Sequence, residues 1–548
     1  MGFRKARRAE IGYDYVVVGA GAAGCAVAAR LSRLEGASVL LMEAGGFSRN
    51  PLLGVPAAAV LSMRTPRYSW RYDTEAEDPD PARASSLMAG RMVGGGTGIN
   101  GLMYLRGHPR DYDRWRDVAG CPGWGYDDIL PFFRRSEASE RGENAYHGGS
   151  GPIGTSRGRA SLPIGAAFLE ACARSGLPVV DDLNALTGEG AGLYDLMARG
   201  GRRSMAGDYL RHVADARGLT VITDALVTGI DIQDGRARAI DYVHRGRRRR
   251  VEAGRDIIVA AGCINTTQLL LLSGIGPATD LTSHGIAVRV DAPQVGANLQ
   301  NHAAASLHFA FDAGMTATDR LRGGGLLTAG IQYLAGRSGI LAELPTPAGA
   351  LIHADGAGAD ATPDTQIILG AGLPGKGRGW NALLSGTPGF MLMVNQGRPE
   401  SRGSIRLRSA DPLAPPLIRN GFFRCDGDRN MLAHAVHRAR AIAENGFSAA
   451  IGVQPQLSSR FALEDDVDAL ARTIHRHVAP YYHMVGSCRM GTDAGAVVDP
   501  ELRVRGIAGL RIADTSVAPL LVNGNTSAMA FMIGERAADF IRADADKA

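Results

Sequence analysis

The chain has 548 residues, a formal net charge of +5 and six cysteines, none of them in a C-x-x-C pair. The length predicts two domains or one elaborated domain. The small charge and the lack of a basic stripe interleaved with aromatics argue against nucleic-acid binding. No apolar run reaches the roughly 18 residues of a spanning helix, no secretory signal is visible, and free thiols fit a reducing compartment, so we expect a cytoplasmic protein.

The first element is a nucleotide-binding unit. Residues 13–18 predict a buried strand, residues 22–34 a helix and residues 38–42 a second strand that ends at Glu43. The turn between strand and helix carries Gly19, Gly21 and Gly24 as G-x-G-x-x-G, which is informative only in this strand–turn–helix context. Gly19 allows the tight turn, Gly21 lets backbone N–H groups approach a pyrophosphate at the helix N-terminus, and Gly24 lets the helix pack closely.

The acid at the end of the second strand is the partner expected for a ribose. Glu43 is placed to accept hydrogen bonds from ribose hydroxyls. The Glu43-Ala44-Gly45 ending, so close to the start of the chain, favours FAD over NAD.

Further along lie a glycine-dense loop (residues 90–101) and a strand–turn–strand region (residues 219–259). A basic run, Arg245 and residues 247–250, sits between two of those strand-like segments; we interpret it as a solvated hairpin tip, with a membrane or partner contact as the alternative. An apolar helix follows residues 260–268.

The second half of the chain is less patterned before it becomes rich in motifs again. Residues 303–395, rich in Ala, Gly and Leu, are where we expect substrate-facing strands and a variable cap. Residues 403–408 alternate like an exposed strand. Because strong motifs stand at both ends of the chain, we expect a discontinuous cofactor domain with the substrate domain inserted.

Several motifs occur in an order that resembles one family. They are G-R-M-V-G-G-G-T-G-I-N at 90–100, the segment 262–276, G-A-N-L-Q-N-H at 296–302, H-M-V-G-S-C-R-M-G at 483–491, and the segments 498–500, 509–516, 523–526 and 534–538. Together they resemble the glucose–methanol–choline (GMC) oxidoreductase family from about residue 12 to 541. The chain departs from the family pattern at Cys263, Thr267 and Asn301, the last replacing the usual acid.

The resemblance implies an α/β (α+β overall) fold, in which a Rossmann-like βαβ domain binds FAD and an inserted antiparallel-sheet domain binds substrate. We place the FAD-binding domain at residues 10–155, 205–302 and 475–545, and the substrate-binding domain at residues 156–204 and 303–474.

The resemblance, together with the nucleotide turn, also implies the cofactor-binding residues. They are Gly19, Gly21, Ala22, Ala23, Gly24, Glu43, Ala44, Arg91, Val93, Gly94, Gly95, Thr97, Gly98, Asn100, Gly101, Met103, Val227, Ala261, Asp514, Asn525 and Thr526. Ile99 stands where some family members carry a histidine bonded covalently to the flavin. Because isoleucine cannot form that bond, we expect non-covalent FAD.

Two residues match the family's catalytic pair. His483 matches the catalytic histidine, which suits a base because imidazole is largely neutral near pH 7. Asn525 matches the second position and can only exchange hydrogen bonds with the substrate oxygen, since an amide is no base. His483 is therefore the sole base candidate of the pair.

The neighbouring residues receive structural interpretations. We expect His302 to close a loop near the cofactor, and His475 and His477 to lie at a helix end. None pairs with carboxylates at metal-ligand spacing, so no metal is proposed.

Two further side chains near His483 bear on the pocket. Of Tyr481 and Tyr482, one is expected to line the pocket and the other to pack inward. Cys488 is expected to be a buried thiol rather than a nucleophile.

The function implied is FAD-dependent oxidation of an alcohol, with oxygen or a quinone-like acceptor reoxidising the flavin. The apolar composition of residues 303–395 suggests a neutral, lipophilic or aromatic primary alcohol rather than a cation, which would want a carboxylate and an aromatic cage. The alternatives are a flavin-containing lyase resembling hydroxynitrile lyases or a fatty-acid photodecarboxylase on the same scaffold, and a non-catalytic flavin-binding protein.

Overall fold

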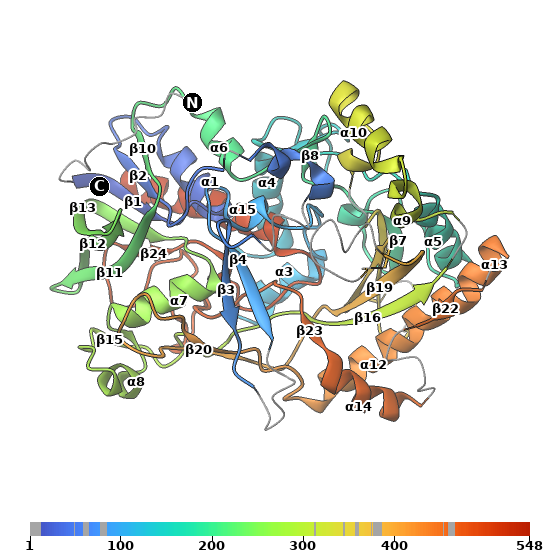
Figure 1. The fold of residues 1–548 in the computed structure, drawn as a ribbon. Helices are drawn as coiled ribbons and strands as arrows, with labels where there is room; N and C mark the ends of the chain where they lie inside the picture. Colours follow the sequence, from blue (N-terminus) through green and yellow to red (C-terminus); the bar gives the residue numbers. More distant parts are fainter. Residues whose placement is uncertain are drawn as a thin grey trace.

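The computed structural model describes residues 12–48, 50–58, 65–76, 85–311, 314–343, 346–356, 361–373, 375, 386–452, 454–458 and 466–547. Parts of the segment 303–395, in which we expect a variable cap, lie outside these residues. Figure 1 shows two sheets, one on each side of the molecule, with helices packed around them.

The first sheet is mixed and has seven strands in the described residues, ordered β10-β2-β1-β13-β12-β11 with β24 pairing β13. Its strands are β1 (Gly12–Val18), β2 (Val39–Met42), β10 (Leu219–Ile222), β11 (Ala225–Gln233), β12 (Arg236–His244), β13 (Arg247–Val259) and β24 (Leu510–Ile512). Strands β10, β2, β1, β13 and β24 run parallel. The apolar strands β1 and β2 are buried, as central parallel strands are.

The second sheet is antiparallel and also has seven strands in the described part, ordered β22-β16-β19-β18-β17-β7 with β23 pairing β16. Its strands are β7 (Gly190–Leu193), β16 (Ala303–Ala310), β17 (Ala348–Ile352), β18 (Thr365–Gly370), β19 (Gly389–Gln396), β22 (Gln456–Leu457) and β23 (Ala479–Pro480). The predicted nucleotide-binding unit and inserted antiparallel sheet are thus confirmed, while the exact domain boundaries stay a prediction.

The remaining elements connect and cover the two sheets. The paired short strands are β3 (Ser69–Asp73) with β4 (Ser86–Gly90), β5 (Glu137–Ser139) with β6 (Ile153–Thr155), β8 (Ala198–Arg199) with β9 (Arg202–Arg203), β14 (Ile275–Gly276) with β15 (Val290–Asp291), and β20 (Ser404–Arg406) with β21 (Leu417–Arg419). The helices are α1 (Ala22–Leu31), α3 (Pro109–Asp117), α4 (Tyr126–Ser136), α5 (Pro163–Arg174), α6 (Gly207–His212), α7 (Cys263–Leu272), α8 (Ala278–Ser283), α9 (Ala317–Leu321), α10 (Gly325–Gly336), α12 (Asp426–Ala441), α13 (Phe447–Ile451), α14 (Val467–His477) and α15 (Thr526–Ala545).

Each sheet has its own apolar core. The first core packs strands of the mixed sheet against α1, α4 and α15. Gly534 of α15 lies so close to α1 that a Cβ there would stand 2.5 Å from the carbonyl oxygen of Ala23. The second core lies between one face of the antiparallel sheet and helices α5, α12, α13 and α14. The other face of that sheet is therefore left for the functional site.

Two local predictions were refined by the structure. The first helix ends at Leu31 rather than residue 34, because the chain turns at Ser32. The hairpin between β12 and β13 turns at Arg245 and Gly246, both with positive φ, while Arg247 begins β13. The arginines at 247–250 are exposed, so the run is solvated as expected but most of it lies on the strand.

Candidate functional site

The glycine turn after β1 has the predicted geometry. Gly19 has φ 101°, and a Cβ on Gly24 would lie 1.9 Å from the Gly19 carbonyl oxygen, so both positions require glycine. A Cβ on Gly21 would meet nothing within 4 Å. Gly21 precedes α1, whose first residues are Ala22 and Ala23. The helix N-terminus thus faces open space, as a phosphate site requires.

The second glycine-rich loop lies directly against this turn. The Gly94 N–H donates to the Ala20 carbonyl at 2.8 Å, and a Cβ on Gly95 would lie 2.7 Å from the Gly21 Cα. The loop continues through the 3-10 turn η4 (Gly95–Gly98), where Thr97 Oγ1 donates to the Gly94 carbonyl. Two glycine segments far apart in sequence therefore form one surface.

Glu43 holds the end of this surface in place. Its carboxylate accepts the N–H groups of Ala20 at 3.0 Å and Gly45 at 2.8 Å. Burial raises the pKa of Glu43 to about 7, against the opposing effect of those two bonds and of the Arg91 charge. The glycine turn itself therefore positions the carboxylate of Glu43, which precedes Ala44. That Glu43 binds a ribose stays a prediction.

A buried arginine that the sequence did not predict as a site residue contacts the second glycine-rich loop. Arg203 donates from Nη1 to the Thr97 carbonyl at 3.1 Å, while its Nε and Nη2 are buried without a partner in the described residues. Burial lowers the pKa of Arg203 to about 9. An unbalanced cation beside a glycine loop fits an anionic group such as the FAD pyrophosphate.

Asp514, one of the predicted cofactor-binding residues, connects two motifs. Its Oδ2 accepts from Gly262 N–H at 2.9 Å and Thr266 Oγ1 at 2.5 Å. Its Oδ1 accepts from the Ser516 N–H and hydroxyl, and burial raises its pKa.

The other predicted cofactor residues extend this surface. Asn100 Nδ2 donates to Ser527 Oγ at 3.0 Å, which links the loop to the start of α15 at Thr526. The Val93 N–H donates to the Gly46 carbonyl. Met103 forms an isolated antiparallel β-bridge with Leu196. Gly98 and Gly101 belong to the same loop, Val227 lies near the start of β11, and Ala261 follows the end of β13. Their contact with FAD remains a prediction.

The predicted pair, His483 and Asn525, comes together in space. Asn525 Nδ2 lies 3.3 Å from His483 Nε2, although the residues are 42 positions apart. His483 follows β23, and its N–H donates to Asn301 Oδ1 at 2.8 Å, so the asparagine in place of the family's acid fixes the backbone of the base. Asn525 immediately precedes α15.

His302, which we interpreted as a loop residue, is in direct contact with the base. Its Nδ1 lies 2.9 Å from His483 Nδ1, and its Nε2 lies 3.1 Å from the Val522 carbonyl oxygen. A carbonyl only accepts, so His302 Nε2 carries the proton and Nδ1 accepts. His483 Nδ1 must then donate, which leaves His483 Nε2 as a free lone pair facing Asn525.

Both imidazoles are held neutral. Burial lowers the pKa of His302 to about 4, against opposing hydrogen bonds to backbone carbonyls. Burial, and secondarily the neighbouring His302, lowers the pKa of His483 well below its usual value. The Nε2 lone pair is therefore available at neutral pH.

Asn525 is oriented by residues of the second sheet. The Tyr194 hydroxyl donates to the Ile367 carbonyl at 3.0 Å. This contact requires glycine at position 349, because a Cβ there would lie 2.2 Å from that hydroxyl. Gln366 Nε2 then donates both its hydrogens, to Tyr194 Oη at 3.2 Å and to Asn525 Oδ1 at 3.3 Å. Because Oδ1 accepts, the Asn525 NH₂ points toward His483.

The side chains that the second sheet presents beside the pair are uncharged. Strand register places Asn395 and Ala304 beside Gln366 on the same face of the sheet, followed by Ser306 and Met393. Gln366 Oε1 and both amide atoms of Asn395 are buried without a partner in the described residues. They are polar groups available to ordered water or to a substrate.

The structure also places the other residues singled out near the base, and lining of the pocket by a tyrosine stays a prediction. The Tyr481 ring meets the His483 ring edge-on with centroids 4.9 Å apart, whereas Tyr482 packs into a separate apolar cluster. Cys488 is fully buried, and burial raises its thiol pKa, which suits a structural thiol. Ile99 is buried against Leu53 and Met92.

The other two histidines lie at the end of a helix. The helix α14 ends at His477, as expected. The side chain of His475 lies outside the described residues.

A histidine–carboxylate cluster elsewhere is an ion network. His147 contacts Glu137 at 3.0 Å and Asp182 at 2.8 Å, and ligand atoms of His147, Asp182 and Asp195 lie within 4.8 Å of one another. Arg141 pairs with Asp195. Bonds to Asp182 and Glu137 outweigh burial and raise the pKa of His147 to about 9. The carboxylates of this cluster are already paired with His147 and Arg141, so we interpret it as an ion network rather than a metal site.

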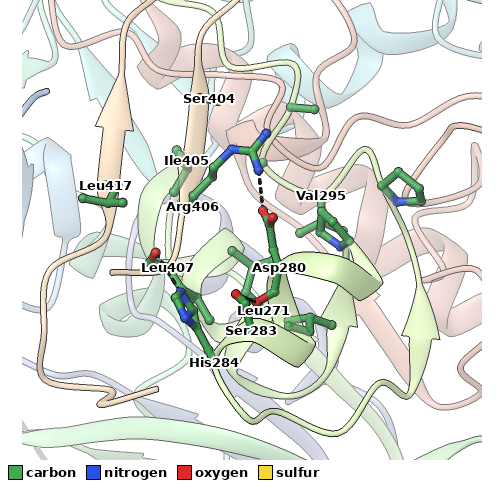
Figure 2. Close-up of a pocket in the computed structure, with 15 residues that line it drawn as sticks. Leu271, Asp280, Ser283, His284, Val295, Ser404, Ile405, Arg406, Leu407 and Leu417 are labelled. Carbon is green, nitrogen blue, oxygen red and sulfur yellow. Dashed lines mark hydrogen bonds and ion pairs between the residues drawn. The ribbon is translucent and has the colours of Figure 1, made fainter. Parts of the chain in front are cut away.

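A separate pocket lies between α8 and β20. Figure 2 shows Arg406 paired with Asp280, and His284 Nε2 bonded to the Leu407 carbonyl at 3.1 Å. None of the predicted catalytic or cofactor residues lines it.

Comparisons with known proteins identify the relatives of this chain. The family model described as GMC oxidoreductase matches residues 13–304 and 399–534. An oxygen-dependent choline dehydrogenase from Rhizobium johnstonii is 37% identical over 96% of this chain and 95% of its own length. A counterpart from Sinorhizobium fredii is likewise 37% identical over the same shares.

Solved structures give the same result. Pyridoxine 4-oxidase from Mesorbium loti superposes with a TM-score of 0.85 at 28% identity, over 97% of this chain and 99% of that one. A fungal aryl-alcohol oxidase shares the fold, with a TM-score of 0.82 at 23% identity over 98% and 99% of the two chains.

Proposed function

The chain belongs to the GMC oxidoreductase family, and on that premise we propose that it oxidises a neutral, lipophilic or aromatic primary alcohol to the aldehyde. FAD, held by the glycine turn, the loop at residues 90–101 and Arg203, would supply at flavin N5 the electron sink for the hydride of the alcohol carbon. The observation that carries the proposal is the forced proton order along Val522, His302, His483 and Asn525.

The catalytic pair is complementary to a hydroxyl group. His483 Nε2 accepts and Asn525 Nδ2 donates, and the two atoms are 3.3 Å apart, a long bond that a substrate would replace. An alcohol donates its O–H to Nε2 and accepts from Nδ2 through its oxygen. As the proton moves to Nε2, the Asn525 N–H supports the negative charge that develops on that oxygen.

The protonated base is also accommodated. When Nε2 takes the proton, His483 becomes an imidazolium whose Nδ1–H still donates to His302 Nδ1. His302 keeps its proton on Nε2 and donates it to the Val522 carbonyl. The ring of the base is thus held in one orientation throughout proton transfer.

The choice of a neutral substrate rests on the face of the second sheet. Strand alternation puts Ser306, His308, Met391 and Met393 beyond Gln366 and Asn395, and burial lowers the pKa of His308. No carboxylate stands on the described part of this face in β16, β18 or β19. The choline dehydrogenase relatives act on a cation by name, but a face that carries two adaptable methionines and no carboxylate in its described part favours a neutral alcohol.

The alternatives gain no support. The relatives reported above are dehydrogenases and oxidases by name, and nothing in the described site favours a lyase or a photodecarboxylase. We propose oxygen or a quinone-like compound as the electron acceptor. We also propose that FAD is held non-covalently, because Ile99 is buried among apolar side chains.

The test is anaerobic titration of the purified flavoprotein with a panel of primary alcohols, choline and a sugar. Bleaching of the oxidised flavin band by benzylic or aliphatic alcohols, with little response to choline, supports the proposal. Rapid bleaching by choline instead contradicts the substrate class. Mixing the bleached protein with oxygen or a soluble quinone then identifies the acceptor.

A further inference from the structure

The helix α10 presents an apolar stripe to solvent. Leu327, Ile331 and Leu334 are 71%, 59% and 86% exposed, and their i, i+4, i+7 spacing puts them on one face. The opposite face is the one that packs: Leu326, Ala329 and Tyr333 lie against Leu321, Leu341 and the segment at Val55. Figure 1 shows α10 at the outer edge of the molecule. Such a contiguous stripe marks an interaction surface.

The surroundings of the stripe are basic. Arg320, Arg322 and Arg337 are exposed on the segment itself, and residues 321–342 contain no Asp, Glu or Lys. The hairpin β8–β9 adds exposed Arg199 and Arg202, because Tyr333 Oη donates to the Gly201 carbonyl at 3.1 Å. Within the described residues, no carboxylate forms an ion pair with any of these five arginines.

We propose that α10 docks on an anionic lipid surface. An apolar stripe that enters the boundary between headgroups and acyl chains, surrounded by guanidinium groups that form no ion pair in the described part of the chain, is complementary to negatively charged headgroups and to the hydrocarbon beneath them. A second copy of the same surface would bring five arginines against five arginines, which opposes self-association. Within the described residues no helix is both long and apolar enough to cross a bilayer, so the contact is peripheral.

The docked helix is structurally connected to the cofactor loop. The hairpin that contacts α10 ends at Arg203, whose guanidinium donates to the Thr97 carbonyl. A lipid surface at α10 therefore adjoins the segment that shapes the proposed FAD site. The docking itself requires no catalysis and is tested without it.

The test is flotation of the holoenzyme with vesicles of phosphatidylcholine alone or with about 30 mol % phosphatidylglycerol, at low and high salt. We expect binding to the anionic vesicles only, weakened by salt. The triple variant Leu327→Ser, Ile331→Ser, Leu334→Ser should bind at least about 30-fold more weakly, whereas Leu413→Ser, at a residue 68% exposed on another surface, should bind like the parent.

A charge pair provides the second arm. Arg199→Gln with Arg320→Gln should weaken binding at least about 10-fold, and the matched control Arg248→Gln with Arg249→Gln, on exposed β13, should change it less than about 2-fold. No binding to anionic vesicles, or equal binding by parent and triple variant, overturns the proposal. So does a dimer in sedimentation velocity that the triple variant abolishes, since a second copy would then cover the stripe.

Discussion

The Nδ1 atoms of His302 and His483 lie 2.9 Å apart, and only His483 can be the donor between them. The carbonyl of Val522 decides this, because it claims the only proton of neutral His302. This donor assignment leaves the lone pair of His483 on Nε2, the atom that faces Asn525. It also makes His302 a positioning residue for the proposed base.

Replacing the base should abolish proton abstraction. We expect His483→Ala to retain FAD while alcohol-dependent flavin reduction slows by about 10³-fold or more. Stopped-flow absorbance under anaerobic conditions measures the rate, and the visible spectrum checks that flavin is bound. Near-normal reduction by the flavin-loaded variant would refute the assignment.

Removing the acceptor behind the base should have a smaller effect. His302→Ala leaves His483 Nδ1–H unpaired and frees the ring, so flavin reduction should slow by about 10- to 100-fold, less than the loss of the base itself. The change should appear in kcat more than in KM, and the pH profile should shift because the neighbouring group has been removed. An unchanged profile and rate would show that His302 only fills space.

Gln366 should act through Asn525. Gln366→Leu removes the donor that turns the Asn525 amide toward His483, and reduction should slow by about 10-fold. In an Asn525→Ala background the same substitution should change the rate by less than about 2-fold, since nothing is left to orient. Additive losses in this double-mutant cycle would assign Gln366 an independent role.

Arg203 should separate cofactor binding from stability. Arg203→Met removes a buried cation with two unpartnered nitrogens. The free energy of unfolding of the apoprotein should therefore be about 1 kcal/mol higher than that of the parent. The same variant should bind FAD at least about 10-fold more weakly, because the anionic pyrophosphate loses its counter-charge. Thermal unfolding of apoprotein and FAD titration measure the two effects, and equal FAD affinity would place the phosphates elsewhere.

The His147 network should make stability fall at alkaline pH. The folded-state pKa of about 9 lies above the usual 6.5, so the stabilisation from His147 is complete below about pH 6.5 and is lost as pH rises through about 9, on the order of 3 kcal/mol. Urea unfolding between pH 6 and pH 10 should show this slope in the parent and lose it in His147→Gln. A slope that persists in the variant would assign it to other groups.

Much of the fold followed from local pattern. The glycines at 19 and 24 were predictable because only glycine allows the positive φ at Gly19 and the close contact at Gly24. The apolar runs at residues 13–18 and 38–42 predicted strands, because a short unbroken apolar run suits a strand that is covered on both faces. His483 and Asn525 were found through motifs, which record residue identity but no geometry.

The sequence by itself therefore determined the nucleotide turn, the family resemblance and the identity of the proposed base. Only the tertiary structure decided the proton order and the amide orientation, because these depend on contacts between distant segments: His302 with His483, 181 positions apart, and Gln366 with Asn525, 159 apart. Arg203 was not predicted for the same reason, since the burial of its guanidinium and the absence of partners for it depend on segments distant in the sequence. Hydrogen-bond direction is set by which partner can only accept, and the sequence does not state which residues will be partners.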